Sequence, residues 1–431
     1  MKRLNLANAT LALLLLASAC STDTRHAHEA AAGPTPAAAS LSRDERVEIF
    51  EQVWQIINDD YYDPAFNGVN WRDVHTRYLP RAESAKTDDE FYRLFEQMLA
   101  ELRDAHTTFS RARPDESKAD GQTINGSVGI SLAEAGGRVV IATVEPDSDA
   151  ARAGVEPGMR LLSVNARPVE ELFAEIRSQF AGSSSERAMK SVMRGALLYG
   201  GFLGTSRTFG VEAFDGRTFD FEVKRRSART PSPALDARRL ASGYGYIKFD
   251  SWEKPVGEKF KAALDDLIDT RGLLIDLRGN GGGSGEVLQQ VASNFFARVT
   301  HSGSFRTRAG GLEKYYTLKP DKVYKGAVVI LVDENSASAS ETFTAFMQES
   351  GRAAVVGRQT CGCALNSYTR KIKGGGTLRF SARLYISPNG RVLEGAGVSP
   401  DEEVPLTVSD LRQGRDAALE AGERRLSSLT R

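Results

Sequence analysis

One stretch organises the fold of this chain: Gly326-Ala-Val-Val-Ile-Leu-Val-Asp-Glu-Asn-Ser-Ala-Ser-Ala-Ser-Glu341. Its apolar, β-branched run from Val328 to Val332 predicts a fully buried strand. A polar turn follows, and alternating Ser and Ala then lead into a segment with helical spacing. Three hydroxyls therefore lie where a strand gives way to a helix, whose free N–H groups and positive dipole end favour a developing negative charge. We interpret the stretch as a site for a nucleophilic serine.

The same letters also have a structural interpretation. Ser338-Ala-Ser-Glu341 matches a capping box, in which Ser338 caps the helix and Glu341 reaches back to it. Caps are far commoner than nucleophiles, so this stretch alone favours the cap. The rest of the chain has to decide between the two.

Length and composition limit the classes of protein to consider. A chain of 431 residues is long for one domain and predicts two to three. Its 41% hydrophobic residues are ordinary for a globular protein with a real core. Lys+Arg and Asp+Glu are equal at 56 each, so the net charge points to no nucleic-acid partner.

The N-terminus has the pattern of a lipoprotein signal peptide over residues 1–19. Two basic residues precede a short apolar run, and small residues come just before Cys20. Because this resembles a bacterial lipobox, we expect lipidation at Cys20 and anchoring to a membrane. Residues 20–42 are rich in Ala, Ser, Thr and Pro, which predicts a flexible tether. The mature body is then expected outside the cytoplasm, facing the periplasm or the cell exterior.

Three folded regions are expected after the tether. Apolar residues at helical spacing over 43–58 and 88–103 predict an N-terminal helical domain, residues 43–112. A polar linker near 226–236 and a change of period mark the start of an α/β core over 237–407. Its short apolar strands alternate with helical segments, which predicts βαβ units and a largely parallel sheet. The expected strands are 245–249, 272–277, 328–332 and 353–357, and the helices lie near 256–269, 285–298 and 338–349. The final segment, 408–431, predicts an exposed helix.

Residues 124–225 combine short strands with glycine turns and resemble a PDZ domain. The match runs from the strand 139–144 through the short helix 149–154 to the turn and strand 157–165, with Met159 in place of the usual Asp. Such domains bind the end of a chain by strand addition and capture its carboxylate on backbone N–H groups. The resemblance places that carboxylate loop at Val128, Gly129 and Ile130. A PDZ fold used only as a hinge or spacer stays the alternative.

A glycine-rich loop, Gly279-Asn-Gly-Gly-Gly-Ser-Gly285, follows the strand 272–277. It has neither the Lys-Ser/Thr of a P-loop nor the spacing of a dinucleotide-binding turn, which weakens a phosphate interpretation. Glycine backbone can instead approach a substrate closely and offer N–H groups to an oxyanion. We favour the oxyanion interpretation.

Four ordered motifs then carry a family resemblance: Asp276-Leu-Arg-Gly-Asn-Gly-Gly-Gly283, Ser336-Ala-Ser-Ala-Ser-Glu341, Gly357-Arg-Gln-Thr360 and Gly395-x-Gly-Val-x-Pro-Asp401. With Leu102-x-Asp-x-His-Thr107, they resemble the C-terminal processing (tail-specific) serine peptidases. The resemblance covers about residues 45–405 and implies a multidomain α/β fold with a crotonase-like catalytic core. It implies Ser338 as nucleophile and the N–H groups of Ala339 and Gly282 as oxyanion donors. It also implies protein or peptide substrates engaged by their C-terminus, with no metal or organic cofactor.

One departure from that family concerns the base. The family's general-base Lys lies 25 residues after the nucleophile, and here that position is Cys363. A neutral thiol is too weak a base, and a thiolate would itself be a nucleophile. The related tricorn-like branch uses a histidine supported by a glutamate, and this chain has His106 and Glu394 at the matching motifs. The helper serine of that branch is Ala105 here, so that polar helper is either missing or supplied by Thr107.

Two alternatives stay open. A non-catalytic relative could bind peptides or apolar ligands in an inactive cleft, and the missing Lys supports it. A thiol or redox role for Cys361 and Cys363 requires a titratable, accessible thiol near the cleft. A disulfide between these two cysteines would close a tight ring, so their state is left undecided.

Overall fold

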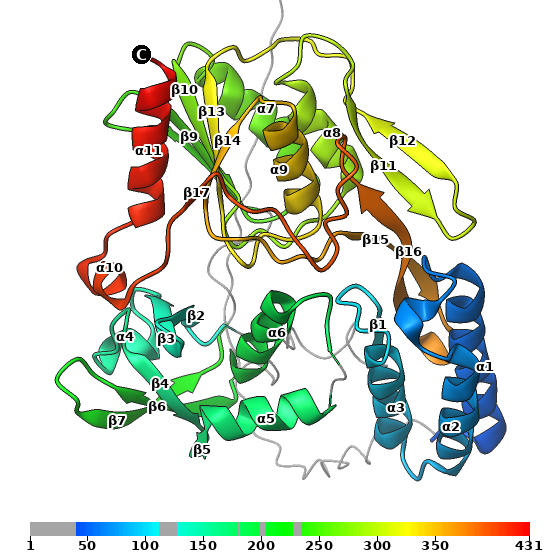
Figure 1. Ribbon diagram of the computed structural model, residues 1–431. Coiled ribbons are helices and arrows are strands. Elements are labelled where there is room, and N and C mark those ends of the chain that lie inside the picture. The colour runs from blue at the N-terminus through cyan, green and yellow to red at the C-terminus, as the bar shows by residue number, and fades with distance from the viewer. Residues whose placement is uncertain (1–39, 112–126, 180–181, 199–203, 227–233) are drawn as a thin grey trace, which may run out of the picture. The chain divides into compact units, whose positions relative to one another are not determined.

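The computed structural model describes residues 40–111, 127–179, 182–198, 204–226 and 234–431 (Figure 1). The predicted signal peptide, Cys20 and nearly all of the tether lie outside these residues, so lipidation stays a prediction. Most of the expected linker at 226–236 lies outside them as well. None of the described helices is long and apolar enough to cross a membrane. Residues 40–431 form one unit by their contacts, and that unit is described below.

The first region is helical, as the amphipathic periods predict. It contains α1 (Arg43–Asp60), η1 (Phe66–Gly68), α2 (Trp71–Ser84) and α3 (Asp88–Ala100). Ser42 and Glu45 form a capping box at the start of α1, and Thr87 caps α3. The hydrophobic cluster of these helices also includes Leu378 and Phe380, which lie far away in the sequence. The helices therefore share their core with a later strand.

The second region is a sheet with helices beside it. Its strands are β2 (Ile130–Ala135), β3 (Arg138–Val144), β4 (Arg160–Val164), β5 (Arg167–Pro168), β6 (Ser206–Glu212) and β7 (Thr218–Lys224). Their order is β2-β3-β4-β6-β7, with β5 paired to β4, so β2 lies at an edge. The helices are α4 (Asp149–Arg152), α5 (Val169–Gln179) and α6 (Glu186–Leu198). The expected strand at 139–144 and short helix at 149–154 are present, and the PDZ-like interpretation stays a prediction.

A six-stranded sheet forms the α/β core, in the order β17-β14-β13-β10-β9-β8. Its strands are β8 (Leu235–Arg239), β9 (Gly245–Phe249), β10 (Gly272–Asp276), β13 (Ala327–Val332), β14 (Ala354–Gly357) and β17 (Glu402–Glu403). All neighbours pair in parallel except β8, which is antiparallel to β9. The predicted parallel sheet is therefore confirmed, with one antiparallel edge strand.

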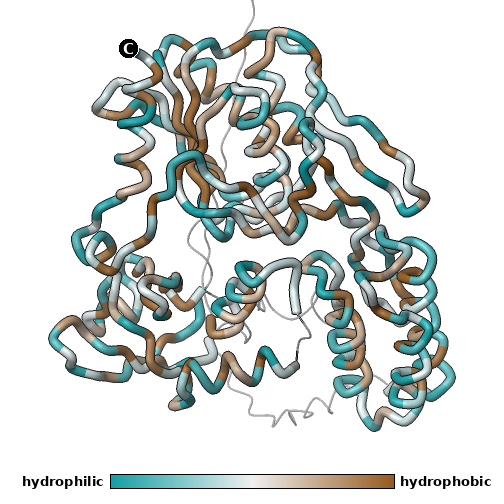
Figure 2. Tube along the Cα trace, viewed as in Figure 1, coloured by the Kyte–Doolittle hydropathy of each residue, from teal (hydrophilic) through white to brown (hydrophobic). Residues whose placement is uncertain are grey.

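Helices cover both faces of this sheet, and the alternation along β13 shows how (Figure 1). Val328, Ile330 and Val332 pack into the cluster that includes α7 (Val256–Asp266), α8 (Gly285–Ser293) and α9 (Ala339–Glu349). Val329 and Leu331 face the other way, into a cluster with α11 (Ala417–Leu429). Because both faces are buried, the strand is apolar at every position. The central strands accordingly form the brown centre of this region in Figure 2.

The C-terminal segment corrects an expectation. The single exposed helix predicted over 408–431 is wrong on two counts. Gly414, in the left-handed conformation, separates α10 (Val408–Gln413) from α11. Ala421, Gly422 and Leu426 are buried on the sheet, so α11 is a core helix. The helix packs so closely that a β-carbon on Gly422 would lie only 2.6 Å from a Leu274 methyl group. The buried face therefore consists mainly of small residues, which give little apolar signal in the sequence.

A third sheet brings the N-terminal region to the core. It contains β1 (Thr108–Ser110), β11 (His301–Thr307), β12 (Leu312–Tyr316), β15 (Leu365–Lys371) and β16 (Thr377–Ile386). β1 follows the motif that carries His106 and pairs antiparallel with β16. β15 pairs with β16 as well, and it begins two residues after Cys363. The first and last thirds of the chain therefore meet through β16.

Candidate active site

Ser338 has an unusual backbone conformation at the point where α9 begins. Its φ and ψ are 56° and −115°, a region that residues with a side chain rarely adopt. Such a conformation costs about 1–3 kcal/mol and persists only where its surroundings impose it. Here the Ser338 N–H donates to the Cys363 carbonyl at 2.8 Å and to the Glu341 carboxylate at 3.1 Å. A serine on a strained strand-to-helix turn is the arrangement of a nucleophile elbow.

The three hydroxyls of the Ser-Ala-Ser-Ala-Ser run differ in their hydrogen bonds. The Ser336 hydroxyl donates to the Leu277 carbonyl and accepts from the Asp333 N–H. The Ser340 hydroxyl donates to the Asn280 carbonyl and accepts from the Trp252 indole. Both are fully buried structural groups. Within the described residues the Ser338 hydroxyl has no acceptor, so its proton is available to a base.

The capping box predicted for Ser338 and Glu341 is present, and its Glu341 half is the stronger. The Ser338 side chain is oriented toward the Glu341 N–H without a regular cap hydrogen bond. The Glu341 carboxylate is fully buried and accepts from the Ser338 N–H, the Thr360 hydroxyl and the N–H groups of Gly362 and Cys363. Burial raises the pKa of Glu341, and these four hydrogen bonds oppose that rise. The capping and nucleophile interpretations of this serine are therefore compatible.

The glycine loop lies directly against the serine. A β-carbon on Gly282 would be 2.6 Å from the Ser338 Cβ and 3.0 Å from the Ala339 nitrogen, and the φ of Gly282 is +99°. The Gly282 N–H donates to the Asn280 side-chain oxygen at 3.0 Å. Among the described residues, the N–H groups of Ala339 and Gly283 have no acceptor. The loop thus places its backbone close to Ser338. Within the described chain the Gly283 N–H is free there, whereas the Gly282 N–H already donates to Asn280.

His106 lies in a turn that its neighbours hold. The Asp104 carboxylate accepts from the His106 N–H at 2.8 Å and from the Thr107 hydroxyl at 2.5 Å. Thr107 in turn accepts from the Ser381 N–H on β16. The imidazole is buried and its Nδ1 has no hydrogen-bond partner. Burial lowers the pKa of His106 to about 4 against the opposing effect of Asp104, so the ring is neutral at pH 7.

Glu394 is partly buried beside the segment that carries the cysteines. It accepts from the Ala364 N–H at 2.7 Å. Burial raises the pKa of Glu394 to about 8; hydrogen bonds from Ser184 and Ala364 oppose the rise, and the nearby Asp104 charge adds to it. Ser184 also accepts from the Ala105 N–H at 3.0 Å. One hydroxyl therefore links the residue next to His106 with Glu394.

The structure brings the predicted catalytic segments together without joining the side chains by hydrogen bonds. Ala105 and Ala337, which precede His106 and Ser338, both pack against the cluster of Ala188, Cys361 and Cys363. In the part of the chain that is described, no hydrogen bond connects Ser338 with His106 or His106 with Glu394. The three segments therefore lie near one another, but their candidate catalytic side chains are not hydrogen-bonded to each other in the described structure.

Position 363 carries no base. Cys361 and Cys363 form a disulfide, and both are buried. A sulfur in a disulfide has neither a thiolate to attack with nor a proton to exchange. The thiol alternative considered above, which requires a titratable and accessible thiol, is therefore contradicted.

The predicted carboxylate loop lies at the edge of the second sheet. Val128 is buried, Gly129 has a φ of +73°, and Ile130 begins the edge strand β2. The Gly129 N–H donates to the Ser127 hydroxyl at 3.0 Å. A Lys190–Glu134 ion pair links α6 to β2. The loop is thus next to a free strand edge and a helix.

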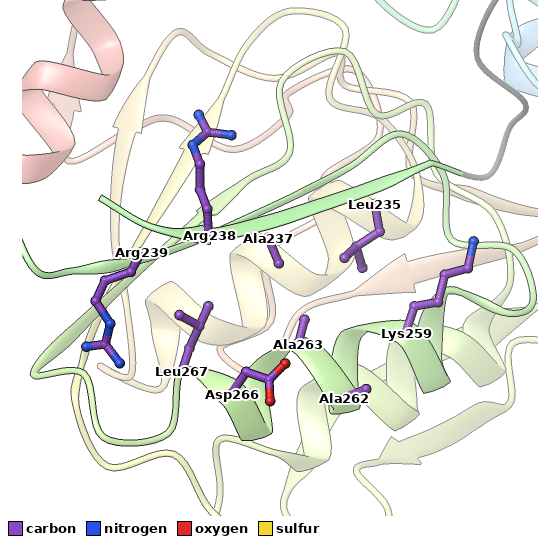
Figure 3. Close-up of a pocket in the computed structure, with 9 residues that line it drawn as sticks. All are labelled: Leu235, Ala237, Arg238, Arg239, Lys259, Ala262, Ala263, Asp266 and Leu267. Atoms are coloured by element: carbon purple, nitrogen blue, oxygen red, sulfur yellow. The ribbon is translucent and has the colours of Figure 1, made fainter. Parts of the chain in front are cut away.

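One cavity lies away from this site and another borders it. A groove of about 600 Å³ lies between the edge strand β8 and α7, where Leu235 and Ala237 face Ala263 (Figure 3). It contains none of the candidate catalytic residues. A smaller cavity, about 270 Å³, borders the His106 turn at Asp104, Ala105 and Thr107, and its other walls include Leu99, Phe109 and Met189.

Sequence reasoning missed two residues of this arrangement. Glu341 was expected only as half of a cap, yet it also gathers the donors of the cysteine loop. Ser184 precedes α6 in the second region and had no motif to mark it. Its sequence distance from Ala105 and Glu394 explains why no local pattern reveals it. The missing helper serine at position 105 was the one available signal.

Comparison with known proteins shows which proteins the chain is similar to. The family model described as "Peptidase family S41" matches residues 243–404, and the one described as "Tricorn protease C1 domain" matches residues 42–100. A carboxyl-terminal-processing protease of Synechocystis is 23% identical over 86% of this chain and 83% of its own length. A tricorn protease homolog of Streptomyces coelicolor is 26% identical over 88% of this chain and 32% of its own length.

Solved structures show the same fold. The photosystem II D1 C-terminal processing protease aligns over 88% of this chain and 97% of its own, with a TM-score of 0.60 and 22% identity. A mutant of CPAF aligns over 90% and 98%, with a TM-score of 0.69 and 13% identity. The chain is a serine-type peptidase, and its residues 243–404 match peptidase family S41. Within that family it fits the C-terminal processing peptidases.

Proposed function

We propose that this chain is an endopeptidase in which Ser338 is the nucleophile, His106 the general base and Glu394 the supporting carboxylate. The observation that carries the proposal is the strained backbone of Ser338 at the start of α9. Two neighbouring hydroxyls of the same run are committed to structural hydrogen bonds, so strain and a free hydroxyl coincide at one residue. Stored strain of this kind clusters at active sites.

The chemistry follows from the protonation states. The Ser338 oxygen attacks the peptide carbonyl while neutral His106 takes its proton, and the imidazolium then returns that proton to the leaving amine. The resulting ester is hydrolysed by water in the reverse sequence of proton transfers. The free N–H of Ala339 and an N–H of the glycine loop, Gly282 or its neighbour Gly283, stabilise the oxyanion. A small movement on substrate binding has to bring the His106 ring to the hydroxyl, since apo hydrogen bonds of this type are often long.

The substrate side of the proposal rests on two features. The loop Val128–Ile130 beside the edge strand β2 suits the end of a protein chain, which would add as a further strand. Peptide binding there competes with the Lys190–Glu134 ion pair. The cavity next to the His106 turn, whose walls include Leu99, Phe109 and Met189, suits an apolar side chain near the cleaved bond. The enzyme is further proposed to act outside the cytoplasm, held at a membrane by a lipid on Cys20.

Labelling with a fluorophosphonate, which reacts with activated serines, tests the nucleophile. The full chain should be labelled at Ser338 and should hydrolyse a denatured protein, and Ser338→Ala should do neither. Ser340→Ala is a poor control because its hydroxyl is structural, so Ser399→Ala, at an exposed position, is the control variant. Absence of labelling in a folded wild-type protein would support an inactive, peptide-binding cleft.

The base is tested separately. His106→Ala should reduce hydrolysis by two to four orders of magnitude, the range of about 10²–10⁴ expected from general-base catalysis. If His106→Ala keeps full activity while Ser338→Ala has none, the histidine assignment is wrong.

A further inference from the structure

The segment Thr360–Cys363 surrounds the backbone of the proposed nucleophile. The Cys363 carbonyl accepts from the Ser338 N–H at 2.8 Å. The N–H groups of Gly362 and Cys363 donate to the Glu341 carboxylate at 2.7 and 2.8 Å, and the same carboxylate accepts from Ser338. Ser338 is therefore connected to the cysteine loop once directly and once through Glu341.

The disulfide gives this loop its shape. Cys361 and Cys363 are separated by one residue, so their bond closes a small ring around Gly362. Gly362 has a φ of +76°, and a β-carbon there would lie 3.0 Å from the Gly395 backbone. Without the disulfide, hydrogen bonds alone restrain this loop, and each contributes a net stabilisation of only about 0.5–1.5 kcal/mol, similar to or less than the strain of about 1–3 kcal/mol at a residue such as Ser338. The disulfide can therefore decide whether the strained backbone conformation of Ser338 persists.

Other contacts hold the same loop from outside. The Ser185 hydroxyl donates to the Cys361 carbonyl, and the Arg187 Nε donates to the Thr360 carbonyl at 2.5 Å. These bonds, like the Thr360 bond to Glu341, do not involve sulfur. Reduction should therefore loosen the inner side of the loop, toward Ser338, while the loop stays attached to the protein.

We propose that the Cys361–Cys363 disulfide and Glu341 are positioning groups that hold the Ser338 backbone in its reactive conformation. The inference rests on the proposed function of Ser338 as nucleophile. A dithiol opens the disulfide in two exchange steps: the reagent's thiolate attacks one cysteine sulfur and expels the other as a thiolate, and its second thiol then displaces the attacked cysteine from the mixed disulfide. The protein gains two thiols, and the reagent becomes a cyclic disulfide. The reduced form has the catalytic side chains but a relaxed turn.

The test compares the oxidised chain, the dithiothreitol-reduced chain and the double variant Cys361→Ser/Cys363→Ser, all carrying Cys20→Ser so that only this pair provides thiols. Alkylation and mass spectrometry verify the thiol state. Fluorophosphonate labelling of Ser338 should slow by about tenfold or more in the reduced chain and the double variant, since small misplacements have effects of this size. Reoxidation should restore labelling, and the reductant should not affect the double variant. The thermal midpoint should change little.

Equal labelling rates in the oxidised and reduced chains would overturn the positioning role, as would a slowing that merely follows loss of folded protein. Amide hydrogen exchange provides a readout that does not depend on activity. Reduction should speed exchange over residues 336–343, with α11 as the unchanged reference. If the oxidised chain is not labelled at all, the proposed function fails; exchange at 336–343 then still decides whether the disulfide orders this turn.

Discussion

At the scale of single residues, the candidate site contains two groups whose pKa values are shifted by burial, His106 and Glu394. His106 is neutral because burial opposes its charged form, which leaves it able to accept a proton. Burial raises the pKa of Glu394 to about 8, which keeps its carboxyl group protonated at pH 7. For Glu394 this neutral form is unfavourable for catalysis, whereas for His106 the neutral form is the one required. A protonated Glu394 can orient an imidazole, but it cannot stabilise the imidazolium by charge.

This difference predicts a pH dependence. If Glu394 supports His106 as proposed, the kcat/KM for peptide hydrolysis should rise as the pH passes upward through about 8, because the ionised carboxylate then stabilises the developing imidazolium. The His106 pKa of about 4 adds no limb near 6.5, since the ring is already neutral there. In Glu394→Gln the rise near pH 8 should disappear and the activity should be low throughout. The exposed Glu403→Gln on β17 is the control. A rise that persists unchanged in Glu394→Gln would exclude this role.

At the scale of elements, the turn before α9 and the glycine loop after β10 form one unit. Asn280 makes the connection: its carbonyl accepts from Ala337 and Ser340, and its amide group donates to Phe249 on β9. Because β10 and β13 pair in parallel, their carboxyl ends lie at the same edge of the sheet. Both loops therefore meet at that edge, where ligands bind in open α/β sheets.

Two adjacent glycines allow a matched experiment on this unit. Gly282→Ala should slow fluorophosphonate labelling strongly and destabilise the fold by about 1–3 kcal/mol, because the new β-carbon meets Ser338 at 2.6 Å and the backbone has a positive φ. Gly281→Ala should resemble the wild type, since nothing lies within 4 Å of its β-carbon. Labelling rates and thermal midpoints measure both. Equal behaviour of the two variants would show that close approach at Gly282 is unimportant.

At the scale of the whole molecule, segments distant in sequence complete the core of the N-terminal helices and one core of the parallel sheet. The N-terminal helices pack on β16, and α11 covers one face of the parallel sheet. The α11 contact should contribute to stability, since Leu426 is fully buried among the residues of this face.

Leu426→Ala should therefore lower the free energy of unfolding by about 2–5 kcal/mol through a buried cavity. Leu429→Ala, on the same helix but 47% exposed, should stay within about 0.5 kcal/mol of the wild type. Denaturant unfolding followed by circular dichroism measures both changes. Similar losses for the two variants would mean that α11 is not docked on the sheet in solution.

Much of this protein was predictable from local patterns. The strand at 328–332, the helix after Ser338 and the glycine loop follow from apolar runs, small residues and turn letters, each of which acts over a few neighbouring positions. The exposed C-terminal helix was predicted wrongly because its buried face consists of Ala, Gly and one Leu, a weak apolar signal.

The remaining features depend on distance in space. The sequence alone determined the motif order, the nucleophile candidate and the absence of a lysine at position 363. Only the tertiary structure decided that Cys361 and Cys363 are bonded, that Ser184 links Ala105 with Glu394, and that Ser338 is strained. The physical reason is that hydrogen bonds, disulfides and burial act between atoms a few ångströms apart, and local sequence patterns do not encode which distant segments the fold brings together.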